Sequence, residues 1–325
     1  MIKVSVVIAM FNGEKFIIKQ LESIKRQTLK VDEVIIIDDA SNDNSYSIVK
    51  AYIEKNGLRH WVLRKAKENK GWKRTFTDGF KIASGEIIFY CDQDDIWIDD
   101  KVERMVKIMD NNFQILCLSS RYDAIDANGE FLKYTADKKS NNTSKISLIE
   151  GYDKRFFAVP SGCTLAIRKK LIEYIDLNEY WCGLDRVLCR TAILLNGMYD
   201  YDLPLILHRF HENNASNTIE DVKNLSGSST YYKRRDYVNQ DLKQLEVFRK
   251  VNSSLIKANS EYVFENMYKF AKARDAFLNY HIYEIFNMIR CVKFPYMALL
   301  VLGDIAYILR VNRIMGKFYR CIMKW

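Results

Sequence analysis

Residues 86–97 read Glu-Ile-Ile-Phe-Tyr-Cys-Asp-Gln-Asp-Asp-Ile-Trp. The apolar run 87–90 is typical of a buried strand, and three carboxylates, Asp92, Asp94 and Asp95, stand where it ends. Carboxylates this close repel one another unless a cation shares the site. Because ligands of open α/β sheets bind just outside the carboxyl ends of strands, this stretch predicts a divalent metal that holds a phosphate-bearing ligand. The alternative is a solvated acidic turn that caps the following helix.

Similar short apolar runs precede this one, and segments with helical periodicity separate them. Continuous apolar runs are typical of strands that are covered on both faces, as in a parallel sheet. The alternation predicts a doubly wound α/β arrangement. We expect strands at 3–10, 34–37, 61–63 and 87–90, and helices at 14–29, 45–53 and 75–83, the last with a C-cap at Ser84-Gly85.

The pattern changes after residue 112. We expect strands with a hairpin at Asn128-Gly129 in 113–135, a polar loop over 137–147, a strand–turn–strand over 156–167, a helix from Asp185 to Leu195 and a strand region over 199–211. From residue 213 onward the pattern is helical to the end.

Composition limits the class of protein. The chain has 325 residues, of which 48% are hydrophobic, so it is not a disordered protein. Its seven cysteines form no CxxC pair, which predicts reduced, buried thiols in the cytoplasm rather than a disulfide framework or a zinc site. Met1-Ile2-Lys3 leads directly into a strand, so no signal peptide is expected.

The positive charge is concentrated near the C-terminus. Residues 231–325 hold 17 of the 50 Lys and Arg and 8 of the 41 Asp and Glu, so the preceding residues hold 33 of each. Such a basic quarter suits an anionic surface, either phospholipid head groups or nucleic acid.

Six stretches together resemble the family 2 glycosyltransferases, enzymes of the GT-A fold. They are Ser5–Gly13, Glu33–Asp43, Asn69–Gly71, Ala83–Glu86, Asp92–Trp97 and Leu207–His211, in the family's order and at about its spacing. The resemblance covers roughly residues 3–215, and the Asp-Gln-Asp-Asp-Ile-Trp variant is most similar to the rhamnosyltransferase-like branch. It implies a GT-A catalytic domain over 1–215, with a mainly parallel sheet flanked by helices, followed by a helical, basic region over 216–325.

The resemblance also implies the reaction. An inverting transfer would move rhamnose or another hexose from a dTDP- or UDP-sugar to a saccharide or lipid-linked oligosaccharide in the synthesis of a bacterial surface polysaccharide. Asp92 would contact the ribose or metal-bound water, and Asp94 and His211 would ligate Mg²⁺ or Mn²⁺. The other implied contacts with the donor nucleotide are Ala9, Phe11, Asn12, Asp38, Asp39 and Gln93.

Each of these assignments has a structural alternative. Asp38 and Asp39 could begin an Asx turn with Ser41, and a lone histidine such as His211 is often a hydrogen-bonded structural residue. Lys73 could hold a diphosphate or could lie on a solvated helix start. This region departs from the family pattern at Thr77, where the family commonly has Asn.

Asp185 stands where the family carries its catalytic carboxylate, with Leu184 in place of the usual first acidic or histidine member. An inverting transfer needs one base to take the proton of the acceptor hydroxyl. Asp185 could also be the N-cap of the helix that follows. The expected acceptor-side residues are Trp97, Gly162 and Cys163, with a packing tryptophan and a tight turn as the alternatives.

The end of the chain interleaves basic with apolar and aromatic side chains. Residues 310–325 have the pattern of a helix that lies in a membrane interface, which predicts a peripheral position on the inner face of the cell membrane. A helical bundle or a homodimer contact is the alternative. The run 294–309 contains Asp304 and is too short to span a bilayer of about 30 Å.

Two other classes of protein remain as alternatives. A nucleic-acid-binding protein would use the basic quarter, but that quarter has no recognisable nucleic-acid motif, and we expect no such partner. An inactive scaffold would keep the fold without the chemistry, and intact Asp92, Asp94 and Asp185 argue against it.

Overall fold

The computed structural model of the chain describes residues 2–132, 143–151, 159–175, 177, 183–212, 214, 234–254, 256, 261–293 and 295–309. The predicted interfacial helix at 310–325 and the first predicted strand of 156–167 (156–158) lie outside these residues. The described chain divides into two compact units. One comprises residues 1–149 and 159–210, and the other comprises 150–158 and 211–325.

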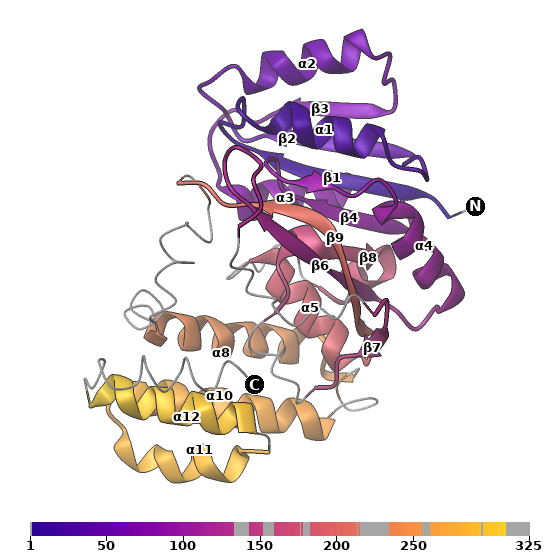
Figure 1. The fold of residues 1–325 in the computed structure, drawn as a ribbon. Coiled ribbons are helices and arrows are strands. Elements are labelled where there is room, and N and C mark those ends of the chain that lie inside the picture. Colours follow the sequence, from indigo (N-terminus) through magenta and orange to yellow (C-terminus); the bar gives the residue numbers. More distant parts are fainter. Residues whose placement is uncertain are drawn as a thin grey trace. The chain divides into compact units, whose positions relative to one another are not determined.

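The first unit is built on a nine-stranded sheet in the order β3-β2-β1-β4-β8-β6-β9-β5, with β7 paired to β9 (Figure 1). Its strands are β1 (Val4–Met10), β2 (Glu33–Asp38), β3 (Trp61–Lys65), β4 (Ile87–Cys91), β5 (Ile96–Trp97), β6 (Cys117–Ile125), β7 (Ile146–Leu148), β8 (Leu165–Arg168) and β9 (Met198–Arg209). Strands β1 to β4 are parallel, as the apolar runs predicted. Strand β8 then pairs antiparallel with β4, so the second half of the sheet is mixed.

Helices α1 (Ile17–Lys25), α2 (Ser45–Lys55) and α3 (Trp72–Ile82) connect the parallel strands β1 to β4. Helix α4 (Lys101–Asn111) follows β5 and helix α5 (Leu184–Leu194) precedes β9, with short 3₁₀ turns η2 (Gly162–Thr164) and η3 (Lys169–Tyr174). Each predicted strand and helix of residues 1–91 is present, with α1 shorter than expected and α3 beginning earlier.

Two local predictions were wrong. Gly85 does not cap α3 in a left-handed conformation; it packs on β1, where a Cβ atom would lie 2.6 Å from the Ser5 backbone nitrogen. The polar segment 137–147 is not all loop in its described part, because Ile146 begins β7 and pairs with Tyr201. The turn at Asn128-Gly129 is present, with Gly129 at φ 96° and a bridge between Ile125 and Phe131.

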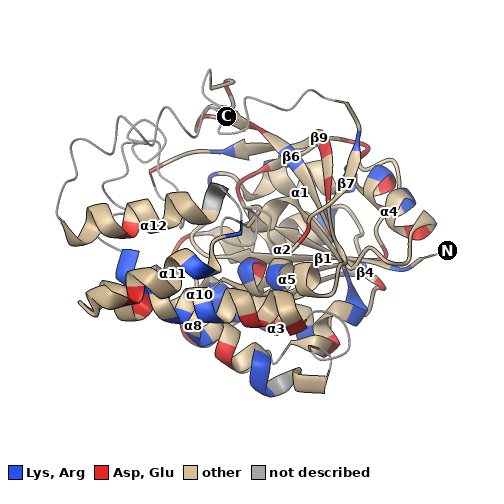
Figure 2. Cartoon of the chain, turned by 90° about the horizontal axis from the view of Figure 1, so that it is seen from below, with Lys and Arg blue, Asp and Glu red and all other residues tan. Residues whose placement is uncertain are grey.

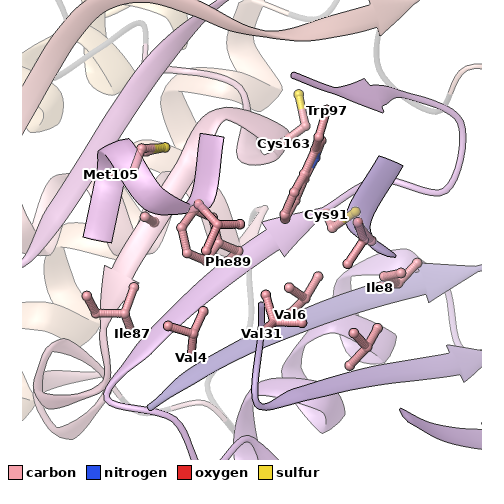
Figure 3. Packing of buried hydrophobic residues seen from close by; sticks show 14 of the residues in the cluster. Val4, Val6, Ile8, Val31, Ile87, Phe89, Cys91, Trp97, Met105 and Cys163 are labelled. Atoms are coloured by element: carbon pink, nitrogen blue, oxygen red, sulfur yellow. The ribbon is translucent and has the colours of Figure 1, made fainter. Parts of the chain in front are cut away.

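The side chains of alternate residues of β1 lie on opposite faces of the sheet. Val4, Val6 and Ile8 belong to a buried cluster with residues of α1, α2 and α4 (Figure 3). On the other face Gly79 of α3 packs so closely on Val7 that a Cβ atom would lie 2.4 Å from it. A strand that is covered on both faces reads as a continuous apolar run, which explains the sequence pattern.

The cysteines fit the same picture. Cys91, Cys117, Cys163, Cys189 and Cys291 are all buried and free, as expected of reduced thiols. Cys182 and Cys321 lie outside the described residues.

The second unit is helical. Its described helices are α8 (Arg234–Val251), α10 (Glu261–Leu278), η4 (Ile282–Glu284), α11 (Ile285–Cys291) and α12 (Pro295–Ile308). The single charged residue of α12 is Asp304, and the described part of the helix is otherwise tan in Figure 2. Asp304 is fully buried and bonded to Arg234 and Arg274, so this charge is paired inside the unit. None of the helices in the described ranges has the length and apolar content needed to cross a bilayer.

Candidate functional site

The strand register brings the predicted site residues to one edge of the sheet. Asp38 is the last residue of β2, and it is paired with Met10 at the end of β1 and Lys65 at the end of β3. Cys91, the last residue of β4, pairs with Ile8, which lies two residues before the end of β1. The loops after β1, β2 and β4 therefore leave the sheet side by side, as parallel strands require.

Side chains join these loops to one another. Gln93 donates from its amide nitrogen to the Phe11 carbonyl at 3.0 Å and accepts from the Phe11 N–H at 2.9 Å. Asn12 accepts from the Asn42 N–H at 2.9 Å, and its own N–H donates to Ser41 Oγ at 2.9 Å. The amide of Gln93 is thus engaged by protein backbone, which gives it a positioning part in the site.

Asp38 and Asp39 are buried, with exposed fractions of 0% and 2%. The Asp38 carboxylate accepts from the N–H and hydroxyl of Ser41, which is the turn that the sequence alternative described. The Asp39 carboxylate accepts from the N–H groups of Lys70 and Gly71 at 2.9 and 2.8 Å, just before α3. Both carboxylates therefore organise the loops, and any contact with a nucleotide would use their remaining lone pairs.

The same edge holds three residues in the left-handed region. Asn12 has φ 50°, Ala40 has φ 59° and Gly71 has φ 81°. This conformation costs an alanine about 1–2 kcal/mol, so surrounding contacts must hold Ala40 in it. Strained residues of this kind gather at binding and catalytic sites.

The acidic cluster, defined here as Asp92, Asp94, Asp95 and Asp185, lies at the carboxyl end of β4. Burial raises the pKa of Asp92 well above its ordinary value, and repulsion from Asp95, Asp94 and Asp185 raises it further. These interactions place the other three carboxylates near Asp92. A cation placed among them would relieve that repulsion.

Asp95 is held differently from its neighbours. Its Oδ1 atom lies 2.8 Å from His208 Nδ1 and accepts from the Arg209 N–H at 3.0 Å. Burial would raise the pKa of Asp95, but the charge and hydrogen bond of His208 prevail and lower it. Burial would lower the pKa of His208, but Asp95 raises it well above its usual value. Asp95 and His208 therefore form a buried ion pair, and Asp95 is the member of the cluster that faces β9.

Asp95, Cys163 and His208 could in principle bind a metal, because their ligand atoms lie within 4.8 Å of one another. We interpret them as a hydrogen-bonded group. The His208 nitrogen is already bonded to Asp95, and burial raises the pKa of the Cys163 thiol to about 12, which disfavours the thiolate that a metal needs.

Lys101, at the start of α4, places a cation under the cluster. Its side chain is fully buried, its Nζ atom donates to the Cys163 carbonyl at 2.9 Å, and it lies 4.2 Å from the ring centroid of Trp97. Burial lowers the pKa of Lys101 to about 8, against the opposing pull of Cys163, Cys91 and the nearby carboxylates Asp95 and Asp92. Sequence reasoning did not single out Lys101 or the pairing of Asp95 with His208.

Asp185 joins the cluster from α5. The helix begins at Leu184 and its N-cap residue is Gly183, so the alternative that Asp185 is the cap was wrong. Burial raises the pKa of Asp185, while the Arg186 N–H, the Arg186 charge and Lys73 oppose that shift. Lys73 of α3 therefore lies within electrostatic range of the predicted base.

The first turns of α3 and α5 meet here. A Cβ atom on Gly183 would lie 3.1 Å from the Trp72 ring and still closer to the Asp185 carboxylate. Trp72 and Lys73 also interact, with Lys73 Nζ 5.6 Å from the Trp72 ring centroid. Lys73 thus lies near the Asp185 carboxylate, and its contact with a diphosphate stays a prediction.

The structure places the expected acceptor-side residues Trp97, Gly162 and Cys163 in packed surroundings, and their contact with an acceptor stays a prediction. Trp97 is 1% exposed and packs on Phe89 and Lys101 in the core, so its ring forms no wall of an open site. Cys163 is fully buried and faces His208. A Cβ atom on Gly162 would lie 2.7 Å from the Tyr90 ring, so that glycine serves close packing.

His211 belongs to the second unit, where its N–H donates to Asn214 Oδ1 at 2.5 Å. Its part in binding a metal stays a prediction.

The acidic cluster fits a hard divalent cation. Asp92 and Asp94 supply carboxylate oxygens, the donors that Mg²⁺ and Mn²⁺ prefer. Asp95 Oδ2 is buried with no hydrogen-bond partner among the described residues, so this oxygen keeps its acceptor capacity. The arrangement could hold a cation that bridges the phosphates of a ligand.

Comparison with known proteins identifies the chain. The sequence profile of Glycosyl transferase family 2 matches residues 5–175, which is more than half of the chain. The chain belongs to glycosyl transferase family 2. That span contains the loops after β1, β2 and β4 but ends before Asp185.

Individual relatives agree with this family. An uncharacterised glycosyltransferase, alr2836, of Nostoc sp. (strain PCC 7120) is 27% identical over 179 residues, 53% of this chain and 53% of that protein. Glycosyltransferase GlyA of Streptococcus pneumoniae serotype 4 is 27% identical over 201 residues, 60% of this chain and 28% of that protein. The matched part thus spans about half of the first relative and less than a third of the second.

Among solved structures, S. aureus TarS 1–349 in complex with UDP-GlcNAc aligns with 98% of this chain and 91% of its own, with a TM-score of 0.60 and 18% identity. At that identity the likeness establishes the fold alone. The expected GT-A fold with a helical C-terminal region is therefore confirmed, because the aligned span includes both.

Proposed function

We propose that this family 2 glycosyltransferase is an inverting, metal-dependent hexosyltransferase that uses a nucleoside-diphosphate sugar. The observation that carries the proposal is the meeting of Asp92, Asp94 and Asp185 with Lys73 at the carboxyl edge of the sheet. Three carboxylates and one ammonium group near one another suit the binding of a divalent cation and a diphosphate. One of the carboxylates can also accept the proton of an attacking hydroxyl.

Each residue has a part in the proposed site. The nucleoside would lie along the loops after β1 and β2, near Ala9, Phe11, Asn12 and the strand-end pair Asp38-Asp39. Asp94 would ligate Mg²⁺ or Mn²⁺, and Asp92 would hold the ribose or a metal-bound water. The cation would stabilise charge on the departing diphosphate, and Lys73 would add to that stabilisation.

Asp185 would be the general base. Its carboxylate takes the proton of the acceptor hydroxyl while the oxygen attacks the anomeric carbon on the face opposite the departing diphosphate, which inverts that centre. Burial raises the pKa of Asp185 toward the range where a carboxylate accepts a proton more readily.

UDP is the first candidate for the nucleotide, because the TarS structure with a similar fold contains UDP-GlcNAc. A dTDP-sugar, with rhamnose as the sugar of the resembling branch, is the second. The proposed acceptor is a saccharide or a lipid-linked oligosaccharide in bacterial surface polysaccharide synthesis, at the inner face of the cell membrane. A homodimer is the alternative use of the helical region.

The test is a panel of UDP- and dTDP-sugars, followed first by thermal shift with Mn²⁺ or with EDTA and then by donor hydrolysis. We expect a rise in the melting temperature for one nucleotide only when Mn²⁺ is present, and slow release of that nucleotide. If no nucleotide sugar shifts the melting temperature under any metal condition, the proposal is wrong.

A further inference from the structure

The outer side of α11 is apolar although nothing in the described chain covers it. Ile282, Tyr283, Phe286 and Ile289 are 59%, 65%, 66% and 56% exposed. Their spacing along η4 and α11 places them on one side of the helix, because residues three and four apart lie above one another. We call these four residues the α11 outer face.

The inner side of the same helix is already used. Met288 and Cys291 are buried, and the Cys291 carbonyl accepts from Asn266 Nδ2 of α10 at 3.0 Å. Helix α11 therefore runs back along α10 within this unit, as Figure 1 also shows. A helix that is apolar on both sides is normally covered on both sides.

Cations gather at one end of this face. Arg290 and Lys293 are exposed and continue the spacing of the outer side. Burial raises the pKa of the Cys291 thiol, and Lys269 and Lys293 oppose the shift, which places both ammonium groups near the end of α11. Glu284 is the only acidic residue between 280 and 293, and it accepts from Asn287 Nδ2 at 2.7 Å.

A second copy of the chain fits this surface poorly. Four large side chains exposed to this extent present on the order of 500 Å², below the roughly 800 Å² per partner of a standard protein interface.

An anionic lipid surface fits it well. Aromatic side chains are enriched at the head-group level of membranes. Neighbouring cations attract anionic phospholipid. The C-terminal quarter, with 17 Lys and Arg against 8 Asp and Glu, has the same preference.

We infer that the α11 outer face, with Arg290 and Lys293, docks on the head-group layer of an anionic phospholipid membrane. The inference rests on the surface of the second unit and holds whether or not the first unit transfers a sugar.

The experiment measures, by flotation, how much of the full chain binds to vesicles. The vesicles contain phosphatidylcholine alone or phosphatidylcholine with about 30% of the anionic lipid phosphatidylglycerol. One variant combines Phe286→Gln with Ile289→Gln, a second combines Arg290→Gln with Lys293→Gln, and the control is Phe113→Gln, an aromatic residue of the first unit that is 74% exposed. Circular dichroism and the melting temperature verify that each variant is folded. We expect all of them to fold, because the substituted side chains are exposed.

We expect the unaltered chain and the Phe113 control to float with anionic vesicles and much less with neutral ones. The Phe286/Ile289 variant should bind anionic vesicles about tenfold more weakly, because two apolar side chains no longer leave water. The Arg290/Lys293 variant should lose most of its preference for anionic lipid. Equal binding by the Phe286/Ile289 variant, or no vesicle binding by the unaltered chain, would overturn the inference. A concentration-dependent dimer that this variant abolishes would point instead to a second copy.

Discussion

His208 Nδ1 lies 2.8 Å from Asp95 Oδ1, and both side chains are buried, so the pair joins the acidic cluster to strand β9. The pair fixes the end of β4 to the end of β9, since the Arg209 N–H and guanidinium also bond Asp95 and the Asp94 carbonyl. Loss of either partner would leave one buried charge without compensation.

His208→Ala should therefore destabilise the first unit by about 3 kcal/mol. Urea unfolding at pH 6 measures the loss, with His60→Ala as the exposed control, which should change stability by less than about 0.5 kcal/mol. The raised pKa of His208 means that its contribution is complete below about pH 6.5 and is lost as the pH rises through the folded pKa. Because the pKa of Asp95 is lowered, the stabilising contribution of its carboxylate is complete above about pH 4 and is lost as the pH falls below that value. A difference between variant and wild type that grows at alkaline pH would contradict this assignment.

Asp185→Asn should retain donor binding and lose transfer. Removal of a general base costs typically about 10²–10⁴-fold in kcat, while KM for the donor should stay within a few-fold. Because burial raises the pKa of Asp185, wild-type kcat should rise with pH through a value above the ordinary aspartate pKa. The control is Asp99→Asn, whose exposed side chain pairs with Arg26. Substantial turnover by the Asp185 variant would remove that residue from its role.

Asp304→Ala tests the helical unit. Asp304 is fully buried between Arg234 and Arg274, so its loss leaves two guanidinium groups without a counter-charge. We expect a loss of about 3–5 kcal/mol in the free energy of unfolding. Glu265→Ala, which breaks the more exposed pair with Arg249, should cost under about 1 kcal/mol. Similar losses for the two variants would show that the buried group is not special.

Gly162→Ala distinguishes packing from contact with a sugar. The new methyl group would meet the Tyr90 ring, which stacks on Phe76 at a centroid distance of 3.7 Å. Overpacking of this kind costs about 1–3 kcal/mol, whereas Ser161→Ala should cost under about 1 kcal/mol. Loss of acceptor affinity without any loss of stability would restore the sequence-based interpretation.

The sequence was most informative where one physical rule acted alone. Runs such as Val34–Ile37, covered on both faces, predicted the parallel strands, and the carboxylates that follow Cys91 predicted where the site would lie. Trp97 and Cys163 were expected on the acceptor side because of the family resemblance, and the structure buries both side chains. Their burial depends on strand β9, which pairs with β5 from more than 100 residues away.

Long-range pairing also hid the Asp95–His208 pair and the cation of Lys101. Nothing local to Leu207-His208 indicates a carboxylate partner, because Asp95 lies 113 residues earlier in the chain, just before the strand β5 that pairs with β9. The helical unit was predicted as a class of structure, but the buried pairing of Asp304 depends on three helices that only the fold brings together.

The central claim is that carboxylates at the strand ends hold a divalent cation, which in turn holds a nucleotide diphosphate. The most direct test is the melting temperature of the wild type, Asp94→Ala and the Asp99→Ala control with Mn²⁺, with UDP or dTDP, and with both together. The account predicts a stabilisation that needs metal and nucleotide together in the wild type and the control and is absent in Asp94→Ala. An Asp94→Ala variant that keeps the full metal-dependent stabilisation would contradict it.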